Sequence, residues 1–301
     1  MTEAVRRAGG QAGSGASGTV ADVLADGEQL LAQAGVADAR REALTLLGAI
    51  AETSPGFLWA RRAEPVVPAI AAAFVRAVAQ RAAGVPAAYA AGTAAFRSLE
   101  LRVDRRVLIP RPETEGLVER VLAWCRTHGR WGVAVDIGTG SGCIALSLAA
   151  EGRFARVIAT DVSGGALAVA RRNAATLGLP AIVEFRGGDL LWALGDGLAD
   201  VIVSNPPYVS ADEWTALDTG VRDHEPRLAL VGGGDGLAHT AVLLAQARGR
   251  LAPGGLLALE VDCRRADRTL ALARAEGWGS ARVERDLFGR ERYLLAEREA
   301  E

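Results

Sequence analysis

Two hydrophobic patterns follow one another along the chain, a helical one first and then an alternation of strands and helices. Apolar positions on one helical face predict three helices, one beginning at Thr19 and the others over 38–51 and 66–83. Thr19 and Asp22, three positions apart, resemble a capping box. We therefore expect a small helical domain over residues 19–95. Residues 1–18 before it carry almost no large apolar side chain, which predicts a disordered tail.

Beyond the helical domain, apolar and polar positions alternate over 96–109, which predicts a β-hairpin linker. Pro112 suits the first position of a helix that runs to about 126. Seven apolar runs then alternate with helical patterns, at 133–137, 156–160, 181–185, 200–204, 255–261, 279–286 and 291–297. This alternation predicts a mostly parallel sheet covered on both faces, in a domain over 110–301.

The last two predicted strands leave no room for a helix between them, so we expect an antiparallel hairpin at or near the sheet edge. Seven strands with a reversed terminal pair resemble the Rossmann-like sheet of class I S-adenosylmethionine-dependent methyltransferases. A dehydrogenase sheet usually keeps its sixth strand parallel. The expected fold is therefore α/β, a class I methyltransferase sheet with a small N-terminal helical domain.

Composition limits the class of protein without indicating an activity. The 301 residues, 50% hydrophobic and 23% charged, suit a soluble globular chain of two domains. A net charge of −2 gives no global basic field for nucleic acid, and the three Cys and three His show neither a disulfide framework nor metal-ligand spacing. The longest apolar stretches are too short to span a bilayer, and the N-terminus lacks a secretory pattern. We expect a cytoplasmic monomer without a metal or membrane partner.

A glycine-rich loop follows the first strand of the predicted sheet. Glycines there permit a tight turn and let backbone N–H groups approach a ligand closely. An acidic residue, Asp136, ends the strand before the loop, and its carboxylate suits the amino group of a methionine moiety better than a pyrophosphate. The candidate cofactor-binding residues are Asp136, Gly138, Thr139, Gly140, Ser141 and Gly142.

Acidic residues also follow the second and third strands. Asp161 suits ribose hydroxyls, a geometry that NAD and S-adenosylmethionine both satisfy. Asp189 can accept from an adenine amino group, with Leu190 packed on the ring. Because ligands bind at the carboxyl ends of strands in such sheets, we interpret the three acids together as a cofactor site.

The sharpest signal is Asn205-Pro206-Pro207-Tyr208, directly after the fourth strand. Two prolines stiffen the loop and present carbonyl oxygens. The Asn205 side chain and the Pro206 carbonyl can hold both hydrogens of a planar NH₂ group and stabilise the positive charge that it develops during methyl transfer. The Tyr208 ring can pack on that group. DNA or RNA amino groups and protein glutamine amides all present such an acceptor, so this loop alone leaves the substrate open.

Two further segments carry a family resemblance. Residues 96–115, FRSLELRVDRRVLIPRPETE, and 225–237, EPRLALVGGGDGL, resemble the HemK/PrmC family of protein-glutamine N5-methyltransferases, which modify peptide-chain release factors. With the N-P-P-Y loop, the glycine loop and the helical domain, the resemblance covers roughly residues 20–298. It implies S-adenosylmethionine as cofactor, with contacts from the glycine loop, Asp161, Leu190 and Asn205. It implies as acceptor the glutamine of the Gly-Gly-Gln loop in release factors one and two.

The resemblance also implies that Asn205, Pro206, Pro207 and Tyr208 bind the glutamine amide. Arg111 and Thr114 would lie beside the cofactor cleft, where Arg111 is either a structural clamp or a substrate contact. The segment 261–265, VDCRR, departs from the Gly, aromatic and Gln that often follow Glu260 in this family. A ribosomal protein as substrate, a nucleic-acid amino group, and a non-catalytic S-adenosylmethionine-binding protein remain the alternatives.

Overall fold

The computed structural model describes residues 18–179 and 181–300, and it divides into two compact units after Ala91. The sequence prediction placed this boundary after residue 95 and treated the hairpin as a linker. In the structure the hairpin starts at Thr93 and belongs to the second unit, because Phe96 and Leu101 are buried in the core of that unit. The predicted tail over 1–18 lies, apart from Gly18, outside the described residues.

The first unit is helical, as predicted. Its helices are α2 (Val20–Gln33), α3 (Ala39–Ile50), α4 (Pro55–Ala60), α5 (Pro68–Ala82) and α6 (Ala87–Ala91), of which α4 and α6 were not predicted. The capping box is present, since the Asp22 N–H donates to Thr19 Oγ1 at 3.3 Å and the Thr19 N–H donates to Asp22 Oδ2 at 2.9 Å. Helices α2 and α5 pack closely at Gly27, where a Cβ would collide with the ring of Phe74.

The second unit is built on a seven-stranded sheet, which confirms the expected fold class. Its strands are β3 (Val133–Ile137), β4 (Arg156–Asp161), β5 (Val183–Gly187), β6 (Ala199–Ser204), β7 (Leu251–Glu260), β8 (Arg282–Arg285) and β9 (Glu291–Glu297). Their order is β5-β4-β3-β6-β7-β9-β8. The first five are parallel, and β9 pairs antiparallel with both β7 and β8, so the expected antiparallel hairpin lies at the edge, with β9 alone reversed.

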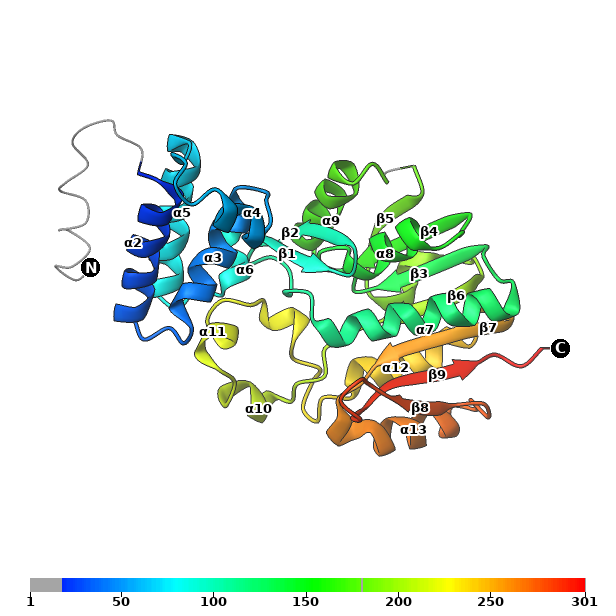
Figure 1. Ribbon diagram of the computed structural model, residues 1–301. Helices are drawn as coiled ribbons and strands as arrows, with labels where there is room; N and C mark the ends of the chain where they lie inside the picture. The colour runs from blue at the N-terminus through cyan, green and yellow to red at the C-terminus, as the bar shows by residue number, and fades with distance from the viewer. Residues whose placement is uncertain (1–17, 180, 301) are drawn as a thin grey trace. The chain divides into compact units, whose positions relative to one another are not determined.

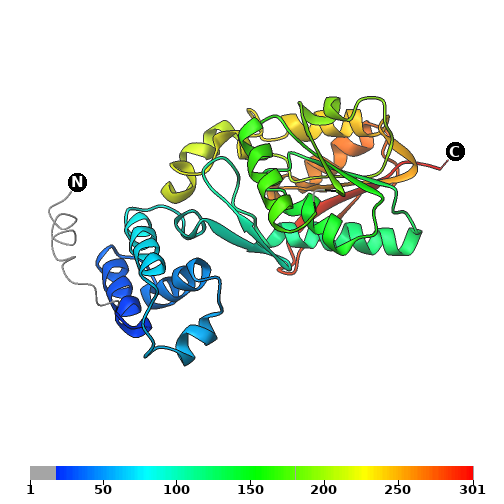
Figure 2. The ribbon, with the colours of Figure 1, turned by 90° about the horizontal axis from the view of Figure 1, so that it is seen from above.

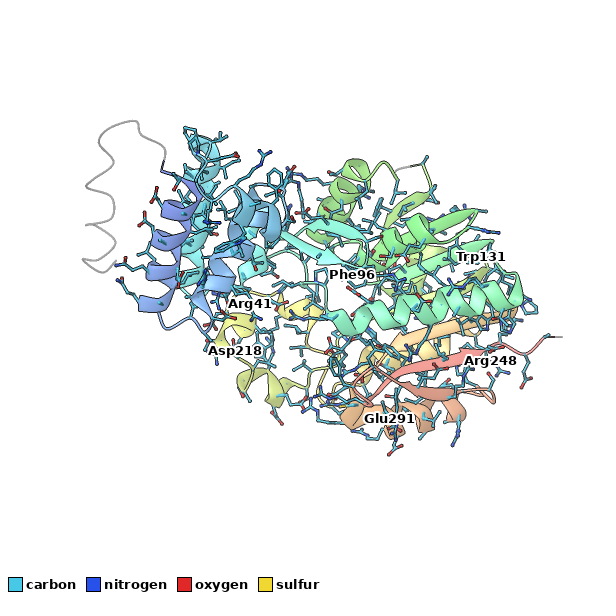
Figure 3. The ribbon with its side chains drawn as sticks, in the orientation of Figure 1. Arg41, Phe96, Trp131, Asp218, Arg248 and Glu291 are labelled. Carbon is cyan, nitrogen blue, oxygen red and sulfur yellow. The ribbon has the colours of Figure 1, made fainter. Side chains whose placement is uncertain are left out.

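Helices cover both faces of this sheet (Figure 2). On one face lie α7 (Pro112–His128), α8 (Cys143–Glu151), α9 (Gly164–Thr176) and the hairpin of β1 (Thr93–Phe96) and β2 (Leu99–Arg102). On the other lie α12 (Ala238–Ala247) and α13 (Ala266–Ala275). Successive strand residues alternate between the two cores: Ala134 packs with the first layer and Val135 with the second. Phe96 and Trp131, labelled in Figure 3, pack in the first layer.

Short elements follow the carboxyl ends of the strands. They are η1 (Leu190–Leu194) after β5, α10 (Ala211–Thr215), α11 (Thr219–Arg222) and η2 (Arg227–Ala229) after β6, and η3 (Cys263–Arg265) after β7. Because β3 to β7 run parallel, these segments and the glycine loop follow strand ends at one edge of the sheet. Figure 1 labels α10 and α11 among them. Among the described residues, no helix is long and apolar enough to cross a membrane.

Candidate active site

A cavity opens at this edge of the second unit, and most of the predicted site residues line it. The predicted residues in its wall are Gly138, Gly140, Asp161, Asp189, Leu190, Asn205, Pro206 and Pro207. The wall is completed by side chains that the sequence did not single out, among them Leu108, Leu228 and His239. The carboxyl ends of four adjacent parallel strands, β5, β4, β3 and β6, therefore converge on one pocket.

The glycine loop forms the part of the wall above β3. Gly138 and Gly140 have φ angles of 71° and 56°, in the left-handed region that other residues rarely adopt. A Cβ built at either position would meet no atom within 4 Å, so open space lies above the loop. The Gly140 N–H donates to Asp161 Oδ2 at 3.0 Å, which ties the loop to the end of β4.

Asp136 supports the loop from beneath and is not among the residues that line the cavity, so its cofactor contact stays a prediction. It is fully buried, and its Oδ2 accepts from the Thr139 hydroxyl at 2.6 Å and from the Ala145 N–H at 3.1 Å. Burial raises the pKa of Asp136 to about 7. Thr139, Ser141 and Gly142 also lie outside the wall. The donors of the loop and of α8 thus occupy Asp136 Oδ2.

Asp161, Asp189 and Leu190 do face the cavity. Asp161 Oδ1 accepts from the Ser163 N–H at 2.8 Å, and burial raises the pKa of the Asp161 carboxyl. Leu190 has a φ of 47°, a strained conformation for a residue with a Cβ. This conformation occurs where the chain turns from Asp189 into η1. The same residue, Leu190, lines the cavity.

The N-P-P-Y loop leaves β6 with its Asn205 side chain anchored. Asn205 Nδ2 donates to Thr114 Oγ1 at 3.1 Å, and the Thr114 hydroxyl donates to Glu260 Oε2 at 2.6 Å. Thr114 lies in the first turn of α7 and Glu260 ends β7, so three elements meet at Asn205. Among the described residues, no hydrogen-bond donor contacts Asn205 Oδ1. This oxygen is therefore available as an acceptor at the cavity.

The Tyr208 side chain is half-buried and is not among the residues that line the cavity, so its packing on the acceptor stays a prediction. The backbone of the same loop packs against the segment 231–236. Val209 pairs with Val231, and a Cβ at Gly232 would collide with the Pro207 carbonyl. The glycines of that segment therefore allow a backbone-to-backbone approach that fixes the loop from behind.

Arg111 acts as a clamp. Its Nη2 lies 2.5 Å from Glu225 Oε1, and Glu225 Oε2 accepts from the Ile109 N–H at 3.2 Å. The Glu225 side chain is 1% exposed, and neither member of the pair lines the cavity. Of the two roles left open for Arg111, this geometry favours the structural clamp. Thr114 likewise lies outside the wall, where it contacts Asn205.

The atypical segment after Glu260 forms ion pairs. Arg265 Nη1 lies 2.5 Å from Asp262 Oδ2, and Arg265 Nη2 lies 2.6 Å from Glu213 Oε2 in α10. Arg265 Nε also donates to the Asp235 carbonyl at 2.8 Å. Residues 261–265 thus connect α10 and the segment 231–236 to the end of β7.

Sequence reasoning missed Glu260 and His239. Glu260 is 1% exposed, and burial raises its pKa to about 7. It could have been found, because it ends a buried strand in the same way as Asp161. His239 lies in the first turn of α12 and lines the cavity, and its buried Nδ1 has no hydrogen-bond partner among the described residues. No spacing in the sequence marked it. Within the same residues, no cluster of His, Cys, Asp and Glu is suited to hold a metal ion.

Comparison with known proteins agrees with this architecture. Residues 118–222 match the family model of the methyltransferase small domain, and residues 22–92 match that of the PrmC N-terminal domain. The chain is 42% identical over 276 residues to the release factor glutamine methyltransferase of Cereibacter sphaeroides, covering 92% of this chain and 97% of that one. It is 44% identical over 284 residues to the protein of the same name in Moorella thermoacetica, covering 94% and 100%.

A solved methyltransferase structure from Pyrococcus furiosus shares the fold. Its TM-score is 0.50 at 23% identity, and the match covers 68% of this chain and 91% of that one.

Proposed function

Because the chain belongs to the release factor glutamine methyltransferase family, we propose that it methylates the glutamine side-chain amide in the Gly-Gly-Gln loop of release factors one and two. The observation that supports this most is the anchored Asn205 amide, which lies beside Pro206 and Pro207 in the wall of the cavity at the sheet edge. Such a site presents acceptors to a planar NH₂ group.

The cofactor is S-adenosyl-L-methionine, which supplies an electrophilic methyl group. The residues present fit it. Any side chain at Gly138 or Gly140 would enter the open space above the loop, so the glycines keep that space clear for a ligand. The Asp161 and Asp189 carboxylates in the wall can accept from hydroxyl and amino groups, and Leu190 offers an apolar contact.

The acceptor amide requires orientation more than a strong base, because its nitrogen lone pair is delocalised. Asn205 Oδ1 and the Pro206 carbonyl would accept its two hydrogens and hold the nitrogen in line. The same two oxygens would stabilise the positive charge that grows on nitrogen, and the proton can leave afterwards. The rigid N-P-P backbone keeps these acceptors in place, since two prolines restrict φ at successive positions.

We also propose that the helical first unit binds the release factor outside the Gly-Gly-Gln loop. Two of its aromatic side chains are exposed, Phe57 at 46% and Trp59 at 55%. The guanidinium of Arg61 lies 4.3 Å from the Phe57 ring centroid, and that of Arg62 lies 4.9 Å from the Trp59 ring centroid. Exposed aromatic and arginine side chains are enriched at protein interfaces.

The test is incubation with labelled S-adenosylmethionine and separate acceptors: release factor, release factor with the Gly-Gly-Gln glutamine changed, ribosomes, and DNA. We expect label on the unchanged factor alone. Equal labelling of both factors would refute the assignment, and label on ribosomes or DNA alone would favour the other substrates. Asn205→Ala should abolish labelling while folding and much of the cofactor affinity persist, and unchanged turnover would contradict the mechanism.

A further inference from the structure

The anchor of Asn205 is a chain of two hydrogen bonds with a fixed direction. Glu260 and Thr114 are almost completely buried, at 1% and 2% exposed. The Thr114 hydroxyl donates to Glu260 at 2.6 Å and receives the Asn205 NH₂ at 3.1 Å. A hydroxyl carries a single hydrogen, so these two bonds depend on one another.

The direction of this chain follows from the charge of Glu260. An ionised carboxylate only accepts hydrogen bonds, so the Thr114 hydrogen must point to it. Thr114 can then only accept from Asn205, which places the Asn205 NH₂ toward Thr114. The other end of the planar amide, Oδ1, is consequently left for the cavity.

We propose that Glu260 is a positioning residue that, through Thr114, sets which end of the Asn205 amide meets the acceptor. This inference rests on the proposed function. With Glu260 ionised, Asn205 presents its carbonyl oxygen to the incoming NH₂ group. We call the chain of hydrogen bonds from Asn205 through Thr114 to Glu260 the relay. With the relay reversed, Thr114 donates to Asn205 Oδ1, and the Asn205 NH₂ group then faces the NH₂ group of the substrate amide without an acceptor between them.

Other charged and titratable groups act on Glu260. They are Arg111 and Glu113 at the start of α7, Arg292 and Tyr293 on β9, Tyr208 after β6, and Cys143 in α8. Burial outweighs the two arginines and raises the pKa of Glu260 to about 7. A protonated Glu260 can donate to Thr114 and no longer fixes the direction of the relay, so methylation should decline as the pH falls below about 7.

The test uses the full chain with release factor as acceptor. Glu260→Met removes the acceptor at Thr114, so the Thr114 hydroxyl turns to Asn205 Oδ1, and we expect kcat to fall roughly 10–100-fold, the effect of one lost hydrogen bond to the charge that grows on the acceptor nitrogen. Glu260→Gln keeps an acceptor oxygen, so it should recover part of that loss, and the decline near pH 7 should disappear because Gln does not titrate. The matched control is Glu284→Met on β8. In the register of the sheet, Tyr293 on β9 lies between Glu260 on β7 and Glu284 on β8. The Glu284 carboxylate accepts a hydrogen bond from Arg120 and lies outside the relay.

A second measurement reports the amide directly. The chain has two asparagines, Asn173 and Asn205, so selective ¹⁵N-asparagine labelling gives two side-chain NH₂ signals. Asn173, whose Nδ2 donates to the Arg102 and Ser141 carbonyls, is an internal reference. We expect a nuclear Overhauser contact between Thr114 and the Asn205 NH₂ that Glu260→Met abolishes.

Three outcomes would overturn the relay. They are a wild-type kcat in folded Glu260→Met, the same decline near pH 7 in Glu260→Gln, and an unchanged Asn205 signal in Glu260→Met. Absence of methylation by the wild-type chain would instead refute the proposed function, and the NMR measurement would still decide the relay.

Discussion

Replacing Arg111, which pairs with Glu225, tests whether Arg111 is a structural clamp or a substrate contact. Arg111→Ala leaves the Glu225 carboxylate, 1% exposed, with the Ile109 N–H as its recorded partner among the described residues. Removing one partner of a buried ion pair lowers the free energy of unfolding by about 3–5 kcal/mol, whereas an exposed pair contributes about 0–1 kcal/mol to it. The Arg111 side chain is 32% exposed, so we expect the free energy of unfolding to fall by about 2–3 kcal/mol.

Urea unfolding of the full chain measures this loss, and Arg105→Ala, an exposed neighbour, is the control, expected within about 0.5 kcal/mol of wild type. Because the clamp involves both side chains, Arg111→Ala and Glu225→Ala should be less than additive when combined. A loss below about 0.5 kcal/mol, together with a raised KM for a Gly-Gly-Gln peptide, would refute the clamp and restore Arg111 as a substrate contact.

Three further outcomes follow from the structure. Gly232→Ala should lower kcat with cofactor affinity retained, because its Cβ collides with the Pro207 carbonyl, whereas Gly234→Ala, which meets open space, should match wild type in the same assay. Asp136 has a pKa raised from 3.8 to about 7, so the folded state binds the extra proton between these values and stability falls as pH rises through them. Asp136→Asn should flatten that slope in urea titrations at pH 4 to 7, and an unchanged slope would contradict the assignment. Trp59→Ser should weaken release-factor binding in calorimetry without changing methylation of a short Gly-Gly-Gln peptide; equal loss with both acceptors would count against a docking role.

Elements with strong periodicity were predictable because burial determines their pattern. The predicted strands 133–137 and 291–297 coincide with β3 and β9. The strand predicted from 255 begins at Leu251, since Pro253 and Gly254 concealed its start. The short α4 and α6 were missed, because five or six residues carry too little periodicity to register as helices.

The site was predictable as a location and less so as a set of contacts. The topology of a parallel sheet brings strand ends to one edge, so acids after successive strands had to lie near the same cavity. The direction of each side chain depends on which donors the adjoining loop offers. Asp161 receives the Gly140 and Ser163 N–H groups and still faces the cavity, while Asp136 receives the Thr139 hydroxyl and is buried.

The same distinction explains why Glu260 escaped notice. Its side chain accepts from Thr114, 146 positions away, and Thr114 in turn contacts Asn205, 91 positions away. No local spacing can encode such a chain of contacts, because it exists only once β7, α7 and the loop after β6 are packed together. The residues that touch the acceptor were readable from a local motif, whereas the residues that orient them are defined by the packing of the sheet.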